Sequence, residues 1–323
     1  MNIIIVCHTE FGFVKNNSII FHKDAIDGVR KGVPNLLTIA QKYNAKITFA
    51  IMPEVVDAFP DIQNHEIGVH IHPGWEEFVV EGIRYHVGDM YLKEHCEQSS
   101  TSTVLRDYTY DEQLTLIKTG KDYIHDKLHA DVKTFVAGRW SINNDTVKAL
   151  IHSGITHDCS APAHIRAPHF DWSKLPRICM PYHPDFNDYQ VKGTAPLLIL
   201  PISQILQYGN VNPEIAPFWG TNLLKACFKE YFVQDMPFFH ICLHSPSMTD
   251  PPMMRALDEL LKYISNRRAH FITASEVIEY QAPAAKTKVL PYLTTGINPT
   301  LIKTLGTEMK NKLFPREHRP SSQ

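Results

Sequence analysis

Two histidines one residue apart, His70 and His72, end an alternating apolar run and are followed by a Pro-Gly pair. The alternation predicts a strand that places Ile67, Val69 and Ile71 on one face and both histidines on the other. Two imidazoles on one face at a strand end can bind a divalent metal ion, because neutral imidazole is the commonest protein ligand of metals. A pair of solvated strand-end histidines is the alternative interpretation.

Polar side chains follow other predicted strands in the same way. They are His8-Thr9-Glu10 after 2–7, Gly138-Arg139-Trp140 after 132–136, His157-Asp158 in 155–158, and His244-Ser245 after 238–243. In a parallel barrel these strand ends converge on one mouth, where active sites form. A carboxylate, several imidazoles, an arginine and an aspartate in one place are the groups of a metal-dependent hydrolase.

Strand-like and helical runs alternate along the chain. The predicted strands are 2–7, 46–51, 66–72, 132–136, 155–158, 197–202, 238–243 and 270–273. The predicted helices are 24–44, 110–128, 143–153, 221–234, 252–267 and 274–280. Asp111 and Glu112 suit a helix start, and Asn143 or Asn144 could cap the next helix. Seven or eight such units indicate a parallel sheet and, at this length, a barrel.

Composition restricts the class of protein. The chain has 323 residues, 44% hydrophobic and 20% charged, which is typical of a globular protein. A net charge of -2 gives no reason to expect a nucleic-acid partner. Six cysteines without a CxxC pair fit neither a disulfide framework nor a thiolate zinc site. The sequence shows no signal peptide and no apolar run long enough to span a membrane, so a cytoplasmic protein is expected.

Three segments interrupt the alternation. Residues 76–109 are polar and rich in Ser and Thr, and we expect either a lid over the strand ends or a mobile surface loop. Residues 159–196 are rich in Pro and His and predict a long loop over one end of the sheet. Residues 281–323 form a basic Pro/Lys-rich tail with a short helix expected near 298–313. The tail is either solvated and packed on the barrel or weakly attracted to an anionic membrane surface or partner.

Taken in order, these motifs resemble those of the polysaccharide deacetylases of the NodB-homology type, carbohydrate esterase family 4. Residues 65–70 (HEIGVH) are similar to the family's H-E-I-G-x-H segment, and Arg139-Trp140 with the helix after it resembles the arginine motif. Residues 157–160 resemble the D-x-S motif, and 243–246 the motif that supplies a catalytic histidine. The resemblance covers roughly residues 2–280 and implies an α/β fold, a distorted (β/α)7 barrel, with residues 281–323 outside it.

The chain also departs from the family pattern. The family commonly has two adjacent aspartates after the first strand, whereas this chain reads His8-Thr9-Glu10, closer to a D-T-E subfamily with His8 replacing the aspartate. The commonest metal pair is His-x-x-x-His, but the residue four after His70 is Gly74, so His72 is the expected substitute. The arginine motif lacks its usual proline. These departures affect the ligand set more than the architecture.

The resemblance implies roles for the polar residues. Glu10, His70 and His72 are the expected ligands of a divalent metal, expected to be zinc, since a catalytic site needs about three protein ligands and one open position. Alternatively, Glu10 is the general base and His8 a ligand. His244 is the expected general acid, unless it is a core histidine bonded to the backbone.

Four further residues are expected at the site. Arg139 and Asp158 are expected to pair, either to shape the site or as a structural ion pair. Trp75 and Trp140 are expected to stack on sugar rings, although both could equally lie in the core.

The expected function is therefore metal-dependent removal of an N-acetyl or similar acyl group from a sugar or polysaccharide precursor. A deformylase or another amidase, such as the allantoinase-like relatives of this fold, is a second hypothesis, because fold does not fix function. A barrel that has lost catalysis and binds a carbohydrate or partner is a third. The altered residues around His8 favour this third hypothesis, whereas His70, His72 and His244 oppose it.

Overall fold

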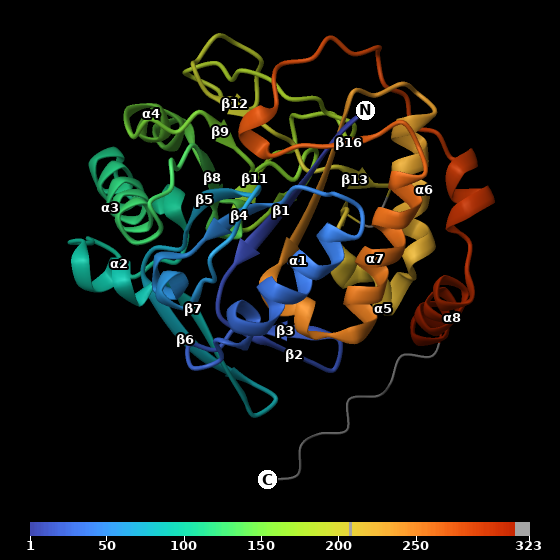
Figure 1. Cartoon of the computed structure of the whole chain (residues 1–323), viewed down its shortest axis with the longest axis horizontal. Helices are drawn as coiled ribbons and strands as arrows, with labels where there is room; N and C mark the ends of the chain where they lie inside the picture. Colours follow the sequence, from blue (N-terminus) through green and yellow to red (C-terminus); the bar gives the residue numbers. More distant parts are fainter. Residues whose placement is uncertain (207–208, 314–323) are drawn as a thin grey trace.

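A curved parallel sheet occupies the centre of the protein (Figure 1). The structure, a computed structural model, describes residues 1–206 and 209–313. The strands follow the order β12-β9-β8-β5-β4-β1-β15, and β16 pairs with the first residues of β1. Their bounds are β1 (Asn2–Thr9), β4 (Thr48–Ile51), β5 (Glu66–Ile71), β8 (Thr134–Ala137), β9 (His157–Asp158), β12 (Leu198–Ile199), β15 (Phe238–His244) and β16 (His270–Phe271). All eight predicted strands are present, and the distorted (β/α)7 barrel is confirmed.

Helices surround this sheet. They are α1 (Val33–Gln41), α2 (Met90–His95), α3 (Tyr110–Leu128), α4 (Asn144–His152), α5 (Ala216–Trp219), α6 (Thr221–Phe232), α7 (Pro251–Ser265) and α8 (Pro299–Leu313). Thr109 and Glu112 form a capping box that begins α3, and Asn143 caps α4. The helix predicted at 274–280 is wrong beyond one turn, because the backbone is extended again at Val277.

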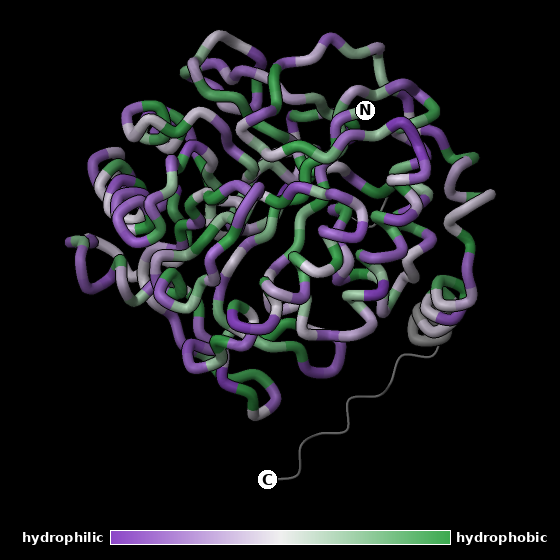
Figure 2. Tube along the Cα trace, viewed as in Figure 1, coloured by the Kyte–Doolittle hydropathy of each residue, from purple (hydrophilic) through white to green (hydrophobic). Residues whose placement is uncertain are grey.

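Each central strand has an apolar face toward the helices and another toward the inside of the barrel. The alternation between these faces determines on which side the last residues of the strand lie. Ile3, Ile5 and Cys7 of β1 pack in the large core beneath the helices. Ile4 and Val6 belong to a smaller cluster made with Ala50, Val136, Leu198 and Phe238 of other strands, which fills the inside of the barrel. Figure 2 shows the hydrophobic residues concentrated along these central strands. Because side chains alternate along a strand, His8 continues the inner face of Ile4 and Val6.

The barrel is closed by irregular backbone between β12 and β15. The backbone N–H of Ser203 donates to the carbonyl of His240 at 3.2 Å, and Cys242 N–H donates to Val211 O at 3.1 Å. Two further short strands, β13 (Gln204–Ile205) and β14 (Gly209–Asn210), lie in this segment. The irregular segment thereby brings residues just after 210 beside the end of β15.

Two hairpins rise at the edge of the sheet where β1 and β5 end. One is β2 (Phe13–Lys15) with β3 (Ser18–Ile20), and the other is β6 (Trp75–Val80) with β7 (Ile83–Gly88). His86 N–H donates to Phe21 O at 2.9 Å, so the two hairpins are hydrogen-bonded to each other. Of the two alternatives for 76–109, an irregular surface loop is wrong for 76–95, because most of these residues form a paired hairpin followed by α2, whereas a lid over the strand ends stays a prediction. The loop expected at 159–196 is largely confirmed, with only β10 (Arg166–Ala167) and β11 (Phe170–Asp171) within it.

The C-terminal segment packs against the helices α5 and α6 (Figure 1). Glu230 of α6 is fully buried, and its carboxylate accepts hydrogen bonds from Arg177, the Lys288 backbone and the Tyr292 hydroxyl at 2.5, 2.7 and 2.8 Å. A helical turn, η8 (Tyr292–Gly296), and the predicted helix α8 follow. The basic residues Arg316 and Arg319 lie outside the described residues. Within the described residues, no helix is long and apolar enough to cross a membrane.

Candidate metal centre and active site

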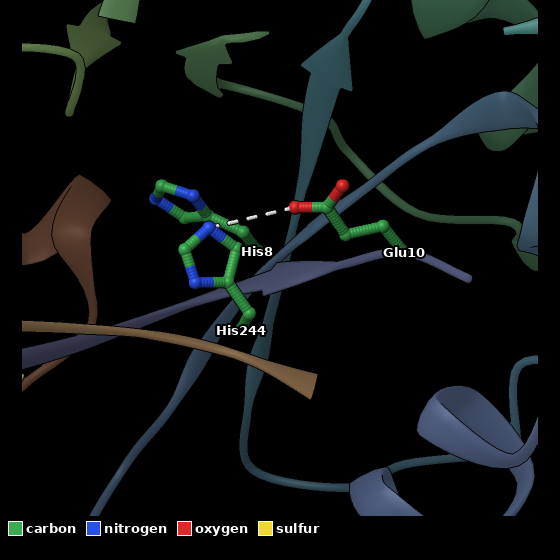
Figure 3. Close-up of side chains that lie close together, drawn as sticks. All are labelled: His8, Glu10 and His244. Atoms are coloured by element: carbon green, nitrogen blue, oxygen red, sulfur yellow. Dashed lines mark ion pairs between the residues drawn. The ribbon is translucent and has the colours of Figure 1, made fainter. Parts of the chain in front are cut away.

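The end of β1 lies next to the end of β15. The two strands are parallel and in register so that His8 is the partner of His244. Their rings are 4.8 Å apart and approach edge to face. Glu10, two residues further, turns its carboxylate toward them, with Oε1 at 3.6 Å from His244 Nε2 (Figure 3). This register places two imidazoles and one carboxylate at the same mouth.

The β5 histidines point at the same carboxylate. His70 Nδ1 lies 3.0 Å from the carbonyl oxygen of Val136 on β8, so Nδ1 carries the proton and donates it there. This leaves a lone pair on His70 Nε2, which lies 3.6 Å from Glu10 Oε1 and makes no hydrogen bond. His72 Nε2 lies 4.0 Å from Glu10 Oε2. The three side chains are almost fully buried.

These three residues fit a divalent metal ion. Their ligand atoms all lie within 4.8 Å of one another. Two ligands about 2.0–2.1 Å from one tetrahedral ion would lie roughly 3.3 Å apart, which is close to the separations around Glu10. Burial lowers the pKa of His72 to about 3, helped by the neighbouring His70, so this imidazole is neutral and available as a ligand. A buried nitrogen without a partner at His70 Nε2 is the position that such an ion would satisfy.

His8 provides a third buried imidazole beside this group. Burial, together with the neighbouring His244 and His70, lowers its pKa well below the usual value, so the ring is neutral. Its Nε2 makes no hydrogen bond. His8, Glu10 and His244 also lie close enough to form a second ligand group. His8 is thus placed either to accept a proton or to act as a further ligand.

Glu214 was not anticipated from the sequence. It lies in a short turn, Pro213–Ile215, that the irregular barrel closure brings against β15. Its Oε1 accepts from the backbone N–H of His244 at 2.7 Å and lies 2.9 Å from His244 Nδ1. Burial would lower the pKa of His244, but the Glu214 carboxylate outweighs it and raises the pKa to about 9. His244 is therefore protonated at neutral pH, which suits an acid better than a metal ligand.

A cavity of about 370 Å³ lies over this group. One wall consists of apolar and aromatic side chains from the two hairpins, namely Ile19, Phe21, Phe78, Tyr85 and Val87. The floor holds Glu10, His8, His70, His72 and His244, with Arg139 and Trp140 at the side. A larger hollow near Lys174 and Tyr280 has no imidazole and lies away from these groups.

The sequence matches no protein-family model and no curated protein. Its structure is similar to a protein from Pseudomonas aeruginosa PAO1 assigned as a polysaccharide deacetylase, with a TM-score of 0.53 and 15% identity over 85% of this chain and 88% of that one. A Mycobacterium smegmatis protein with the same assignment has a TM-score of 0.50 and 16% identity over 84% and 87%. The chain has the polysaccharide deacetylase fold.

Other activities occur on similar structures. PuuE allantoinase has a TM-score of 0.53 and 14% identity over 85% of this chain and 88% of that one. At such identity the similarity establishes the polysaccharide deacetylase fold and leaves the reaction to the geometry of the site.

The expected pairing of Arg139 with Asp158 is wrong. Arg139 Nη1 lies 2.9 Å from His169 Nε2, and Nη2 lies 3.6 Å from Glu76 Oε2. Asp158 is fully buried and accepts from the Ser160 hydroxyl at 2.5 Å, while burial raises its pKa to about 7. Asp158 comes from β9, further along the sheet, and does not line the cavity, whereas Arg139 does.

The two tryptophans proposed for substrate contact also differ. Trp140 lines the cavity, and its ring lies 6.4 Å from that of His8. Trp75 begins β6 and packs between Phe11 and His86, with ring separations of 6.4 and 5.3 Å. Trp75 supports the hairpin and does not line the cavity, so only Trp140 retains the proposed stacking role.

Gly138 makes room for the His72 imidazole. A Cβ atom at this position would lie 2.5 Å from ring atoms of His72, and the backbone of Gly138 itself needs no left-handed conformation. The next two residues, Arg139 and Trp140, do adopt left-handed backbone, with φ of 54° and 51°. Such strain is held in place by surrounding structure and occurs often at functional sites.

We expect Gly138→Ala to weaken metal binding by roughly 10- to 100-fold, the usual effect of disturbing the residues that support a ligand. The added methyl group must displace the His72 ring, whereas the fold can remain intact. Competition with a zinc chelator measures the affinity, and Gly306→Ala is the matched control because nothing lies within 4 Å of its added Cβ. Equal affinity in both variants would show that His72 is not a ligand.

Proposed function

We propose that this protein is a metal-dependent hydrolase that removes an N-acetyl or similar acyl group from a sugar or polysaccharide precursor. The observation that supports it most is the convergence of Glu10, His70 and His72 beside the His244–Glu214 pair. The polysaccharide deacetylase fold supports a carbohydrate substrate, and Trp140 offers an aromatic face for a sugar ring.

Each side chain of the site has a separate role in the proposed hydrolysis. Glu10, His70 and His72 would hold the metal ion, which when bound lowers the pKa of a water and polarises the amide carbonyl. His8, neutral with Nε2 free, is the group that can accept a proton from the attacking water. His244 holds a proton that it can donate to the departing amine nitrogen, and Glu214 orients the ring through Nδ1.

A second candidate is hydrolysis of a small amide that is not part of a polysaccharide. The cavity is at the lower end of the roughly 300–1,000 Å³ typical of ligand sites, and apolar side chains of two hairpins form its wall. A compact, partly apolar amide fits such a site at least as well as an extended polymer. The allantoinase among the similar structures is consistent with this candidate.

The proposal is tested by metal analysis together with hydrolysis assays. We expect about one divalent metal ion per chain and release of acetate from an N-acetylated sugar that a chelator abolishes and zinc restores. Acylated amines of similar size without a sugar ring are the comparison set. One metal ion per chain, with cleavage of the acylated amines but not of the N-acetylated sugars, would favour the second candidate. Absence of metal from protein purified without chelators, with activity unaffected by chelation, would contradict both.

A further inference from the structure

The C-terminal segment contains no acidic residue between positions 282 and 307. Three lysines, Lys286, Lys288 and Lys303, lie in it. The sequence after it adds four basic residues, Lys310, Lys312, Arg316 and Arg319, and two acidic ones, Glu308 and Glu317. Such a local excess of positive charge contrasts with the net charge of -2 of the whole chain.

Large apolar side chains are exposed along the same segment. In the described part of the chain, fourteen large hydrophobic residues are exposed, and six of them fall between 289 and 305. They are Val289, Leu290, Leu293, Ile297, Ile302 and Leu305. Figure 2 shows hydrophobic stretches recurring on this outermost part of the trace, outside α6. Scattered exposed apolar residues need no explanation, whereas exposed apolar side chains that gather on one surface mark an interaction site.

The anchoring of the segment explains why these side chains face outward. The Tyr292 hydroxyl reaches inward to the buried Glu230, and Leu301 is buried in the first turn of α8. With these two side chains directed inward, Leu290, Leu293 and Ile302 remain on the outside, each more than half exposed. The outward face is therefore fixed by packing within the protein.

Apolar and basic groups are also adjacent in space on this surface. A shallow hollow of about 300 Å³ is lined by Val233, Leu290 and Pro291, with Lys229 and Lys288 at its edge and Thr294 beside them. Val233 and Leu290 are both exposed although they belong to different elements. The surface thus combines an apolar depression with two ammonium groups.

This chemistry suits a lipid surface better than a protein partner. Protein interfaces are enriched in Tyr, Trp and Arg and depleted of Lys. Here the exposed apolar residues of the segment are all aliphatic and its described cations are all lysine. Aliphatic side chains can enter the boundary between headgroups and acyl chains, while lysines extend their ammonium groups to anionic headgroups. We propose that residues 286–305, with Val233 and Lys229, bind the surface of an anionic lipid bilayer.

The test is sedimentation of the full-length protein with lipid vesicles. We expect binding to vesicles of equal parts phosphatidylcholine and phosphatidylserine, little binding to phosphatidylcholine alone, and loss of binding as salt is raised. Lys286→Glu with Lys288→Glu should lower the partition coefficient by at least about tenfold, since each lysine near the surface contributes about 1 kcal/mol. Leu290→Asp with Leu293→Asp should lower it similarly by removing apolar insertion.

Matched variants serve as controls. Lys118→Glu with Lys262→Glu changes the charge equally on α3 and α7, and Phe186→Asp with Val191→Asp alters exposed apolar residues of the 159–196 loop. Neither control should change binding beyond twofold. Failure of the unmodified protein to bind phosphatidylserine vesicles at low salt would overturn the proposal without involving any variant. A concentration-dependent dimer that the leucine variant abolishes, without vesicle binding, would instead assign this surface to a second copy of the chain.

Discussion

Replacing His244 by alanine is expected to lower turnover by roughly 100- to 10,000-fold, the usual contribution of a general acid, while leaving the metal bound. The reason is that His244 is held protonated by Glu214, at 2.9 Å from Nδ1, and no other described side chain at the cavity floor is a comparable acid. Alanine also leaves the Glu214 carboxylate without its partner, so His244→Gln is the better variant. Its amide can still donate a hydrogen bond to Glu214, yet it cannot supply a proton.

The pH profile separates an acid from a structural histidine. Because the pKa of His244 is raised to about 9, the protonated form persists at neutral pH and is lost only as the pH rises through that value. In Glu214→Gln the raising charge is removed while burial still lowers the pKa. The basic limb of kcat/KM should then shift to lower pH, with metal content unchanged. A profile identical to that of the unmodified protein, or near-normal turnover in His244→Gln, would show that His244 is structural.

Among the single substitutions proposed for this site, removal of His70 or His72 should weaken metal binding most. We expect His70→Ala and His72→Ala to lower zinc affinity by more than about 100-fold, beyond what supporting residues contribute. Glu10→Gln should have a similar effect, because two neutral imidazoles cannot offset the charge of the ion. Chelator competition followed by metal analysis provides the measurement. His169→Ala, which contacts Arg139 and belongs to neither ligand group, is the control.

The Glu10 variant also distinguishes the two roles that the sequence left open. If Glu10→Gln keeps its metal and loses only turnover, Glu10 is the base and His8 becomes the ligand candidate. If the variant keeps both, the site does not work through this carboxylate, and a carbohydrate-binding barrel without catalysis becomes the better interpretation. Unchanged affinity in His70→Ala and His72→Ala would contradict the ligand assignment as a whole.

The sequence predicted the barrel and the convergence of strand ends because both depend on local patterns. The alternation of apolar residues around Ile4 and Val69 predicted two strands with polar residues at their ends. Because parallel strands run in the same direction, these ends lie on the same side of the barrel. The register between β1 and β15 then placed His8 beside His244, a contact across 236 positions that follows from the fold. The convergence of Glu10, His70 and His72 is a consequence of the same rule.

The features that the sequence did not predict depend on contacts between residues that are far apart in the chain. Glu214 lies in a turn whose Asn212 and Pro213 indicate only a helix start, and nothing local connects it with His244. Asp158 ends a strand as the residues of β1 do, yet it is in register with Phe135 and Ile199, which pack in the core beneath the helices, so it does not share the inner face that carries the site. The β6–β7 hairpin had a weak signal in Glu81-Gly82, whose left-handed φ values of 51° and 75° permit a tight turn.

The buried Glu230 has a consequence for how much of the chain can be dispensed with. From its composition alone, the segment after residue 281 would be expected to be dispensable for folding. Yet two of the three hydrogen bonds to this carboxylate come from Lys288 and Tyr292. A chain ending before them would lose both of these hydrogen bonds and keep the one from Arg177, and a hydrogen bond to a charged group contributes about 1.5–3 kcal/mol. Residues 288–292 therefore complete the packing around a buried side chain of the barrel, and we expect their removal to destabilise the protein as a core substitution does.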